Sequence, residues 1–295
     1  MPLDGFLVID KPPGWTSHDV VAKVRRAAGG KAAPRVGHAG TLDPIATGVL
    51  VVCLGAATRL SEWATADDKR YLAEVRLGIE TDTYDADGTV VAERPVAVSA
   101  ERVEAALTDL RGTIEQLPPA HSAIKVGGRR LYDLARRGEA VDVPARTVTI
   151  HELTLLDLEG PRLRLDVRCS KGTYVRSLAH DLGRRLGCGA HLSGLRRTAS
   201  GPFTLAQAHR LDEAVAALQA GQGARLALPL ETAVADFARV DVGGAAAARL
   251  RQGQPVEGPT AAGGSLGRAH GPDGRLIAVV EHRGGLWWPK KVLAA

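Results

Sequence analysis

A single carboxylate stands in a glycine-flanked stretch near the N-terminus of this chain. Residues 37–48 have the sequence Gly-His-Ala-Gly-Thr-Leu-Asp-Pro-Ile-Ala-Thr-Gly, which places Asp43 directly before Pro44. Proline biases the preceding residue toward an extended backbone, and glycines let another chain approach closely. Such a loop suits a nucleophile that must reach a bulky substrate. Asp-Pro is also a common helix start, and the dipeptide alone favours that structural interpretation, with Asp43 as cap.

A second chemically active group stands at the start of a predicted helix. Residues 162–169 alternate as a strand, and a turn leads from them into the helix. The apolar stripe of this helix consists of Val175, Leu178, Ala179 and Leu182. Arg176 lies off the stripe in the first turn, where the helix dipole disfavours a cation. A negative group should compensate, and Asp43 or an RNA phosphate would do so. The alternative is a surface arginine that extends into water.

Several elements are expected to hold these groups in place. They are a strand at 6–9, a helix from a cap at Ser17 to Gly29–Gly30, a strand at 49–54 and a strand at 70–77. Residues 49–54 form an unbroken apolar run, which is typical of a central strand. Residues 70–77 alternate and place Tyr71 on the buried face.

Length and charge bound the class of protein. A chain of 295 residues is long enough for two domains. Its formal net charge of +5 favours a polyanionic partner, although many proteins with this excess bind none. Cys53, Cys169 and Cys188 are isolated, so neither a disulfide framework nor a zinc site is expected, and a reducing cytoplasm fits best. No export signal and no membrane-spanning run is recognisable, so we expect a soluble protein that is not exported.

Two further segments are strongly charged. Residues 81–88 are acidic, but they lack the spacing that ends a calcium loop with a bidentate glutamate, so no metal is expected there. Residues 117–146 begin with a proline pair and continue as a basic run. The basic side chains are Lys125, Arg129, Arg130, Arg136 and Arg137. They indicate either a solvated surface loop with a short helix or an arm that grips phosphates.

Taken in order, several blocks of the chain resemble the bacterial tRNA pseudouridine-55 synthases of the TruB type. The blocks are Asp-Lys-Pro-Pro-Gly-Trp-Thr-Ser at 10–17, the stretch 37–50, Lys-Arg-Tyr at 69–71, the acidic segment 81–88, Cys-Ser-Lys-Gly-Thr-Tyr-Val-Arg at 169–176, Gly-Ala-His-Leu at 189–192 and Leu-Arg-Arg at 195–197. Their order and separation over residues 6–203 make the resemblance specific. A weaker similarity continues to the C-terminus.

The resemblance implies an α+β fold. A large mixed, mainly antiparallel sheet flanked by helices and loops is expected in a catalytic domain at residues 1–233, with an RNA-gripping arm at about 117–146. A small β-rich, PUA-like RNA-binding domain is expected at residues 234–295. In this part the sequence indicates a short helix at 245–250, a strand at 276–280 and a Trp287-Trp288 pair, of which at least one ring is expected to be buried.

The activity implied by the resemblance is the isomerisation of one uridine, at position 55 in the T-loop of tRNA, to pseudouridine. The bond from ribose C1′ to N1 breaks, the base rotates, and a bond from C1′ to C5 forms. Neither a cofactor nor a metal is needed. Asp43 matches the catalytic aspartate, which can abstract a proton, trap the sugar covalently, stabilise its charge or add to the uracil ring. A loop substrate is favoured because flipping an unpaired base costs less.

Other positions take roles from the same resemblance. Arg176 matches an active-site arginine that would pair with Asp43. Tyr71 matches the tyrosine that stacks on the target base, although a core role on its strand is the alternative. The remaining matches are His38, which would fill the gap left by the flipped nucleotide, Tyr174 and Leu195, which would contact substrate, and Lys125, Arg129 and Arg130 of the arm.

Two positions are treated differently. Lys11 belongs to the opening motif, but beside two prolines it is expected to cap a turn, and no catalytic role is assigned to it. His121 stands where the family usually has Tyr or Phe, which affects only the packing of the arm. The expected partner is the T-arm of tRNA, bound by a cytoplasmic monomer. A tRNA-folding assistant and a guide-RNA-dependent synthase are the alternative functions.

Overall fold

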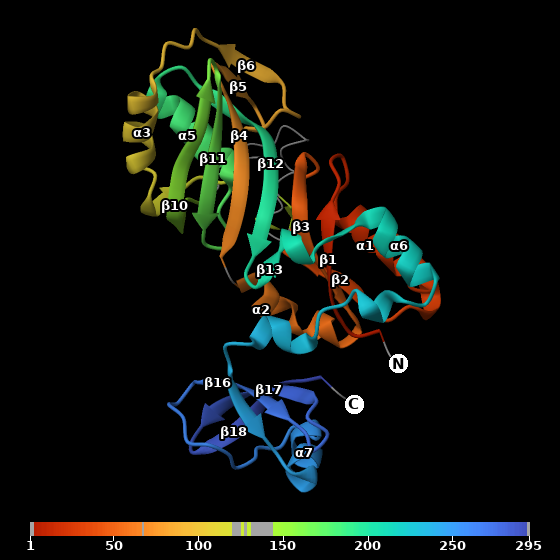
Figure 1. The fold of residues 1–295 in the computed structure, drawn as a ribbon. Coiled ribbons are helices and arrows are strands. Elements are labelled where there is room, and N and C mark those ends of the chain that lie inside the picture. Colours follow the sequence, from red (N-terminus) through yellow and green to blue (C-terminus); the bar gives the residue numbers. More distant parts are fainter. Residues whose placement is uncertain (1–2, 67, 120–124, 127–128, 131–143, 294–295) are drawn as a thin grey trace.

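The computed structural model describes residues 3–66, 68–119, 125–126, 129–130 and 144–293. Within them, one large sheet with its helices is joined to a smaller sheet that ends at the C-terminus (Figure 1). None of the helices in these ranges is long and apolar enough to cross a membrane.

The large sheet has the strand order β14-β1-β3-β12-β4-β11-β10-β7, with β2 paired to β3 and β13 to β12. Its strands are β1 Gly5–Lys11, β2 Val36–Ala39, β3 Ala46–Leu54, β4 Lys69–Leu77, β7 Gly112–Gln116, β10 Arg146–Glu159, β11 Arg162–Cys169, β12 Ala190–Ser200, β13 Phe203–Thr204 and β14 His209–Arg210. The pairs β1–β14 and β12–β3 are parallel, and the other pairs in the sheet are antiparallel. The predicted mixed, mainly antiparallel sheet is therefore confirmed.

Helices cover this sheet unevenly. The α-helices are α1 Ser17–Ala27, α2 Ser61–Ala66, α3 Ala100–Thr108, α5 Val175–Leu186, α6 Leu211–Gln219 and α7 Gly244–Arg251. Short 3₁₀ helices are η1 Gly30–Ala32, η2 Gly55–Leu60, η3 Leu205–Gln207, η4 Gly223–Arg225 and η5 Leu230–Val234. Helices α3 and α5 pack side by side against β10 and β12, whereas α1 and α6 pack on each other at the other end of the sheet (Figure 1). Two hairpins stand apart, β5 Ile79–Thr81 with β6 Val90–Glu93 and β8 Lys125–Val126 with β9 Arg129–Arg130.

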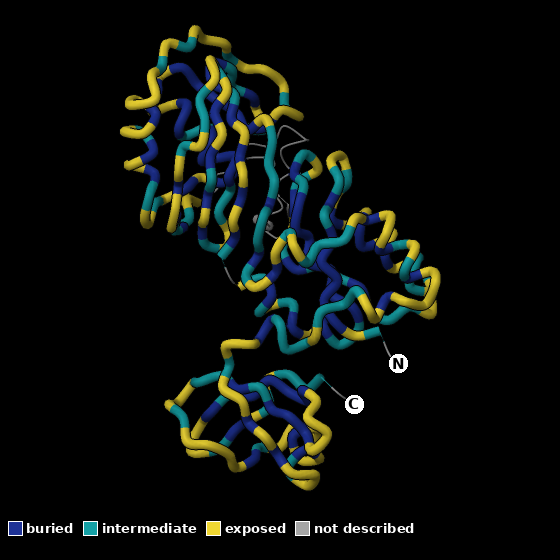
Figure 2. The backbone as a smooth tube through the Cα atoms, in the orientation of Figure 1, coloured by how far each residue is buried: buried dark blue, intermediate teal, exposed yellow. Residues whose placement is uncertain are grey.

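The pattern of each strand follows from what covers it. Strand β3 is apolar from Val49 to Leu54 because both of its faces are buried there: Leu50 and Val52 lie in one core cluster, and Val49 and Val51 lie in the other. Strands β4 and β11 alternate because the helices cover one face only. Figure 2 shows the buried residues along the inner strands and inside the C-terminal part. The strands expected at 49–54, 70–77 and 162–169 are confirmed.

The helix cap expected at Ser17 is wrong by one residue. Thr16 caps α1. The Asp19 backbone N–H donates to the Thr16 hydroxyl, and the Thr16 backbone N–H donates to the Asp19 carboxylate, which together form a capping box. Ser17 is buried, and its hydroxyl bonds instead to Leu42. The Ser17 hydroxyl therefore makes a tertiary contact in place of the helix cap that the local sequence pattern predicted.

The interpretation of Asp43 as a helix cap is also wrong. The Ala46 N–H donates to the Asp43 carbonyl at 3.0 Å, which closes a tight turn. Strand β3 begins at Ala46, so no room is left for a helix. Asp43 therefore lies in a turn between two strands, as a loop-borne reactive group would.

The C-terminal part is a four-stranded sheet in the order β15-β16-β17-β18. Its strands are β15 Ala238–Asp241, β16 Leu266–His270, β17 Leu276–Arg283 and β18 Leu286–Val292. The helix and strand expected at 245–250 and 276–280 are confirmed as α7 and β17. Trp287 is 1% exposed within the core of this part, whereas Trp288 is 42% exposed, so the expectation of one buried ring is confirmed. The β-rich C-terminal part lies within the predicted range 234–295.

Gly48 allows β3 and β12 to approach closely. Its φ is +93°, and a Cβ built there would lie 2.2 Å from the Arg197 carbonyl oxygen. The close neighbour is therefore another strand of the same sheet.

We expect Gly48→Ala to lower the free energy of unfolding by more than about 1 kcal/mol, because it adds a backbone clash to an unfavourable φ. Gly187→Ala is the matched control, since Gly187 has φ +80° with nothing within 4 Å of a built Cβ. Urea unfolding of both variants measures the difference. Equal losses would show that the close approach at Gly48 costs nothing.

Candidate active site

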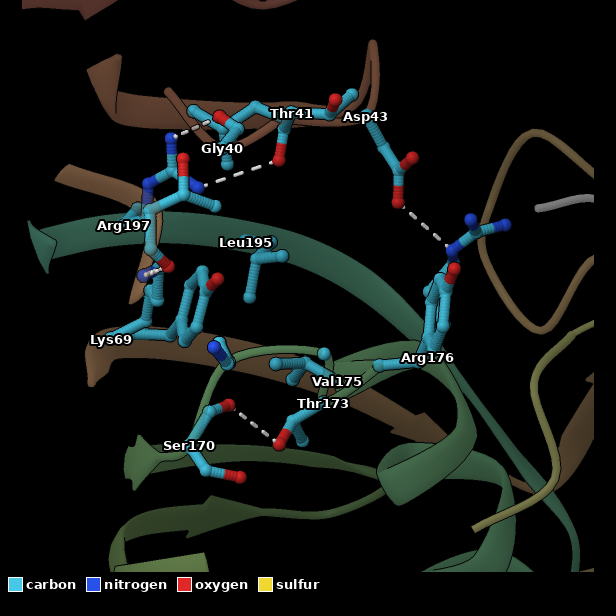
Figure 3. Close-up of a pocket in the computed structure, with 16 residues that line it drawn as sticks. Gly40, Thr41, Asp43, Lys69, Ser170, Thr173, Val175, Arg176, Leu195 and Arg197 are labelled. Atoms are coloured by element: carbon cyan, nitrogen blue, oxygen red, sulfur yellow. Dashed lines mark hydrogen bonds and ion pairs between the residues drawn. The ribbon is translucent and has the colours of Figure 1, made fainter. Parts of the chain in front are cut away.

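A cavity of about 360 Å³ lies where four segments distant in sequence meet. The Asp43 turn forms one wall, β4 supplies Lys69 and Tyr71, β12 supplies Leu195 and Arg197, and residues 170–176 close the remaining side (Figure 3). The volume lies in the range of pockets that hold small ligands. Only the folded chain brings these segments together.

Asp43 and Arg176 form an ion pair at the edge of this cavity. Arg176 Nε lies 3.0 Å from Asp43 Oδ2 (Figure 3), and Nη1 lies 3.1 Å from Asp85 Oδ2. Nη1 also donates to the Thr83 carbonyl at 3.2 Å. The predicted pairing of Asp43 with Arg176 is confirmed, and a second carboxylate completes it.

The burial of Arg176 explains why acidic side chains surround it. It is 5% exposed, so the surface-arginine alternative is wrong. A buried cation is costly unless opposite charges and hydrogen bonds compensate it, and the start of α5 adds an unfavourable dipole. Asp43 and Asp85 together supply this compensation.

Two side chains from the N-terminal elements hold the Asp43 turn. Ser17 Oγ donates to the Leu42 carbonyl at 3.1 Å and accepts from the Leu42 N–H at 2.8 Å. Lys11 Nζ donates to the carbonyls of Pro12, Trp15 and Pro44 at 3.0, 2.6 and 3.2 Å. Burial lowers the pKa of Lys11 to about 8, against the opposing effect of Asp43. The prediction that Lys11 caps a turn is confirmed.

Arg197 holds the same segment from β12. Its side chain is buried, and it donates to the carbonyls of Gly40 and Thr41 at 2.9 and 3.4 Å (Figure 3). It also donates to the Val49 carbonyl at 2.7 Å. Because five guanidinium N–H groups are arranged in a rigid fork, one arginine can fix several carbonyls at once. The turn that carries Asp43 is thus fixed from three directions.

The electrostatics of Asp43 reflect both its packing and its neighbours. Its side chain remains 37% exposed because it faces the cavity. Loss of solvation raises the pKa of the Asp43 carboxyl above its ordinary value, Arg176 lowers it, and Asp85 raises it further. Desolvation therefore outweighs the ion pair, which does not depress this pKa below the ordinary range.

Three of the other predicted site residues line the cavity. Tyr71 and Leu195 lie on adjacent strands, and Tyr71 is also packed in the main core. Tyr174 precedes α5, and its backbone bonds to both amide atoms of Gln116. The Arg146 guanidinium lies 5.4 Å from the centre of its ring. Both interpretations of Tyr71, as core aromatic and as cavity wall, fit its position.

His38 lies outside the lining of this cavity. It is in β2, where its ring is edge-on to His18 at 5.7 Å. Burial, then His18, lowers the pKa of His38, so its ring is neutral at neutral pH.

The predicted arm is only partly described. The backbones of Lys125, Arg129 and Arg130 lie in the β8–β9 hairpin, where Lys125 pairs with Arg130. Their side chains, and His121, lie outside the described residues.

Sequence reasoning missed the roles of Asp85 and Arg197 and the position of Lys69 on the cavity wall. Asp85 stands in the acidic segment that was considered only for calcium, and Lys69 and Arg197 stand in motif blocks without an assigned role. The usable signal for Asp85 was the need of Arg176 for negative charge. In the described residues no group of three or more His, Cys, Asp or Glu could hold a metal ion. The three cysteines are free and buried.

Comparison with known families identifies the class of protein, which is a pseudouridylate synthase. Residues 25–175 match the model described as "TruB family pseudouridylate synthase (N terminal domain)". Residues 176–235 match "tRNA pseudouridylate synthase B C-terminal domain", and residues 237–294 match "tRNA Pseudouridine synthase II, C terminal". The chain belongs to the TruB family of pseudouridylate synthases.

Individual relatives agree. A protein of Symbiobacterium thermophilum named tRNA pseudouridine synthase B is 56% identical over 85% of this chain and 82% of its own length. One of the same name from Thermobifida fusca is 46% identical over 99% of both chains. Among solved structures, a chain of an "H/ACA RNP bound to a substrate RNA containing 2'-deoxyuridine" is similar with a TM-score of 0.76 and 25% identity, over 99% of this chain and 86% of that one. A chain of a "Cbf5-Nop10-Gar1 Complex" has a TM-score of 0.75 at 27% identity, over 99% and 85%.

We expect Asp43→Asn to leave the melting temperature at pH 7 equal or higher. The folded-state pKa of Asp43 is raised, so its ionised form costs stability above the ordinary aspartate pKa, and the neutral amide removes that cost. Calorimetry measures both proteins.

Asp85→Asn is the matched control. Asp85 Oδ1 accepts from Thr83 and Asp87, and Oδ2 faces Arg176, so an amide nitrogen there meets a donor. This variant should lose about 1–3 kcal/mol of stability. A lower melting temperature for Asp43→Asn than for Asp85→Asn would contradict the conclusion that the desolvation cost of the Asp43 charge exceeds its attraction to Arg176.

Proposed function

We propose that this protein converts the uridine at position 55, in the T-loop of tRNA, to pseudouridine, without an added cofactor. The Asp43–Arg176 ion pair at the edge of a cavity lined by Tyr71 carries the proposal. The names of its relatives, tRNA pseudouridine synthase B, support tRNA as the substrate. The net charge of +5 favours a polyanionic partner.

The reaction is an isomerisation, so substrate and product nucleoside contain the same atoms. The bond from C1′ to N1 breaks, the uracil rotates, a bond from C1′ to C5 forms, C5 loses its proton, and N1 gains one. Asp43 acts as an ionised carboxylate on the nucleoside. Abstraction of a proton, covalent capture of the sugar, charge stabilisation and addition to the ring are the routes open to it.

The predicted site residues take separate roles in this reaction. Arg176 orients the Asp43 carboxylate and stabilises its negative charge. The aromatic ring of Tyr71 on the cavity wall suits stacking against a uracil that has left its loop. Tyr174 and Leu195, which also line the cavity, contact the nucleotide, and His38 fills the space that the flipped nucleotide leaves. Lys125, Arg129 and Arg130 contact backbone phosphates of the T-arm.

The proposal is tested with a tRNA transcript and purified protein. Pseudouridine should form at position 55 and be absent there in tRNA from cells that lack this protein. Asp43→Asn should bind tRNA yet form product more slowly by about a thousandfold or more, the scale of loss for a catalytic carboxylate. Undiminished product, or product only at other positions, would overturn the proposal.

Two alternatives are resolved by the same material. Because this chain is similar to a chain of an H/ACA RNP, a second candidate function is pseudouridine synthesis that depends on a guide RNA. Turnover of a bare transcript by the purified protein excludes it. If the protein is a tRNA-folding assistant, the Asp43→Asn variant should still promote tRNA folding. A tRNA-folding assay on this variant therefore separates folding assistance from catalysis.

The rate should depend on pH through Asp43. Because the pKa of Asp43 is raised and the ionised form is active, the single-turnover rate should fall as pH decreases, with a midpoint above about 3.9, the ordinary aspartate pKa. Saturating enzyme keeps tRNA binding from limiting the rate. A midpoint at or below the ordinary value would count against an ionised Asp43 in this environment.

Arg176→Lys should slow product formation by about ten- to a hundredfold. A single ammonium cannot reach Asp43 and Asp85 with separate, fixed nitrogens, so the Asp43 carboxylate loses its orientation. Single-turnover rates measure the loss, and Arg164→Lys, at an exposed surface pair, is the control. A rate close to that of the parent protein would refute the orienting role.

A further inference from the structure

Tyr84 has an unusual backbone next to the active site. Its φ is +63°, and among the described residues it is the one non-glycine residue with a positive φ. A tyrosine in this conformation is strained and persists only where surrounding contacts fix it. Such strain is often associated with a functional position.

The ring of Tyr84 stacks face to face on His180. The ring centres are 3.9 Å apart, and the planes differ by 13°. His180 lies on α5 four residues after Arg176, so both side chains leave the same face of the helix. The stack ties the 81–88 turn to the helix that carries Arg176.

The residues on both sides of Tyr84 converge on Arg176. The Thr83 carbonyl and Asp85 Oδ2 both contact Nη1, at 3.2 and 3.1 Å. Thr83 Oγ1 donates to Asp85 Oδ1 at 2.6 Å, and the Leu192 N–H donates to the Tyr84 carbonyl at 3.0 Å. The left-handed residue between them brings two acceptors to one nitrogen.

We propose that Tyr84 and His180 are positioning residues: their stack holds Asp85 and the Thr83 carbonyl on Arg176 and thereby sets how the guanidinium charge is shared between Asp85 and Asp43. Neither ring lines the cavity, so both act through Arg176 rather than on the nucleotide. The role in catalysis rests on the proposed function, whereas the effect on Asp43 does not.

The charges around each ionisable group define the expected shift. Asp43 is faced by Arg176, Asp85 and Lys11. His180 is faced by Asp181, Glu80 and Arg184, and burial lowers its pKa, so at neutral pH it stacks as a neutral ring. When the stack is lost, Asp85 moves away from Arg176, and the guanidinium serves Asp43 alone. The pKa of Asp43 then falls.

The first experiment reads this pKa without reference to activity. Carbon-13 NMR follows the Asp43 carboxyl of the free protein, with Asp43→Asn identifying its resonance. Tyr84→Asn tolerates the left-handed backbone but has no ring, and the Asp43 pKa should fall. Tyr84→Phe keeps the ring and should restore the parent value. An unchanged or raised Asp43 pKa in Tyr84→Asn would overturn the proposal, whatever the protein catalyses.

The second experiment tests whether the two rings act together. With a T-arm transcript, Tyr84→Asn and His180→Ala should each slow single turnover by about ten- to a hundredfold, with tRNA affinity kept within about twofold. The double variant should be no slower than the slower single variant, because both changes remove one contact. Independent losses that multiply would refute the stack as the shared cause. No product from the parent protein would instead refute the proposed function.

Discussion

The sharing of one buried guanidinium between two carboxylates determines the arrangement of the site. Arg176 stands on α5, Asp43 on the turn before β3 and Asp85 on the turn after β5, so the pair of contacts joins three separate parts of the chain. A buried arginine without a counter-charge would be strongly unfavourable. The ion pairs of Arg176 therefore help to position the two turns that carry Asp43 and Asp85.

The Asp43 turn has little regular structure of its own, and side chains from elsewhere replace the missing backbone bonds. Ser17, Lys11 and Arg197 bind its carbonyl and amide groups from α1, β1 and β12. Polar groups fixed before substrate arrives need no reorganisation during reaction. This explains why so many polar side chains near the cavity are buried.

Several strands followed from local patterns, the sheet as a whole followed from the family resemblance, and the Asp43–Arg176 pair of the site followed from charge. Strands at 70–77 and 162–169 were predictable because their burial alternates with the period of a strand, and the strand at 49–54 was predictable because it is an unbroken apolar run. The Asp43–Arg176 pair was predictable because a cation in the first turn of α5 needs a counter-charge. Arg197 was not, because its acceptors lie about 150 positions earlier in the chain. Thr16 was missed because two adjacent hydroxyls fit the cap equally, and a distant contact decided between them.

The packing of the C-terminal sheet has a thermodynamic consequence. Leu276 and Val279 of β17 belong to the same apolar cluster as Phe6 and Val8 of β1, and Lys291 lies 3.1 Å from Glu62 of α2. Separating the two parts would expose both sides of that cluster to water. Heat or denaturant should therefore unfold the two parts in one cooperative step. The C-terminal sheet thus covers part of the core around β1 in addition to forming its own core.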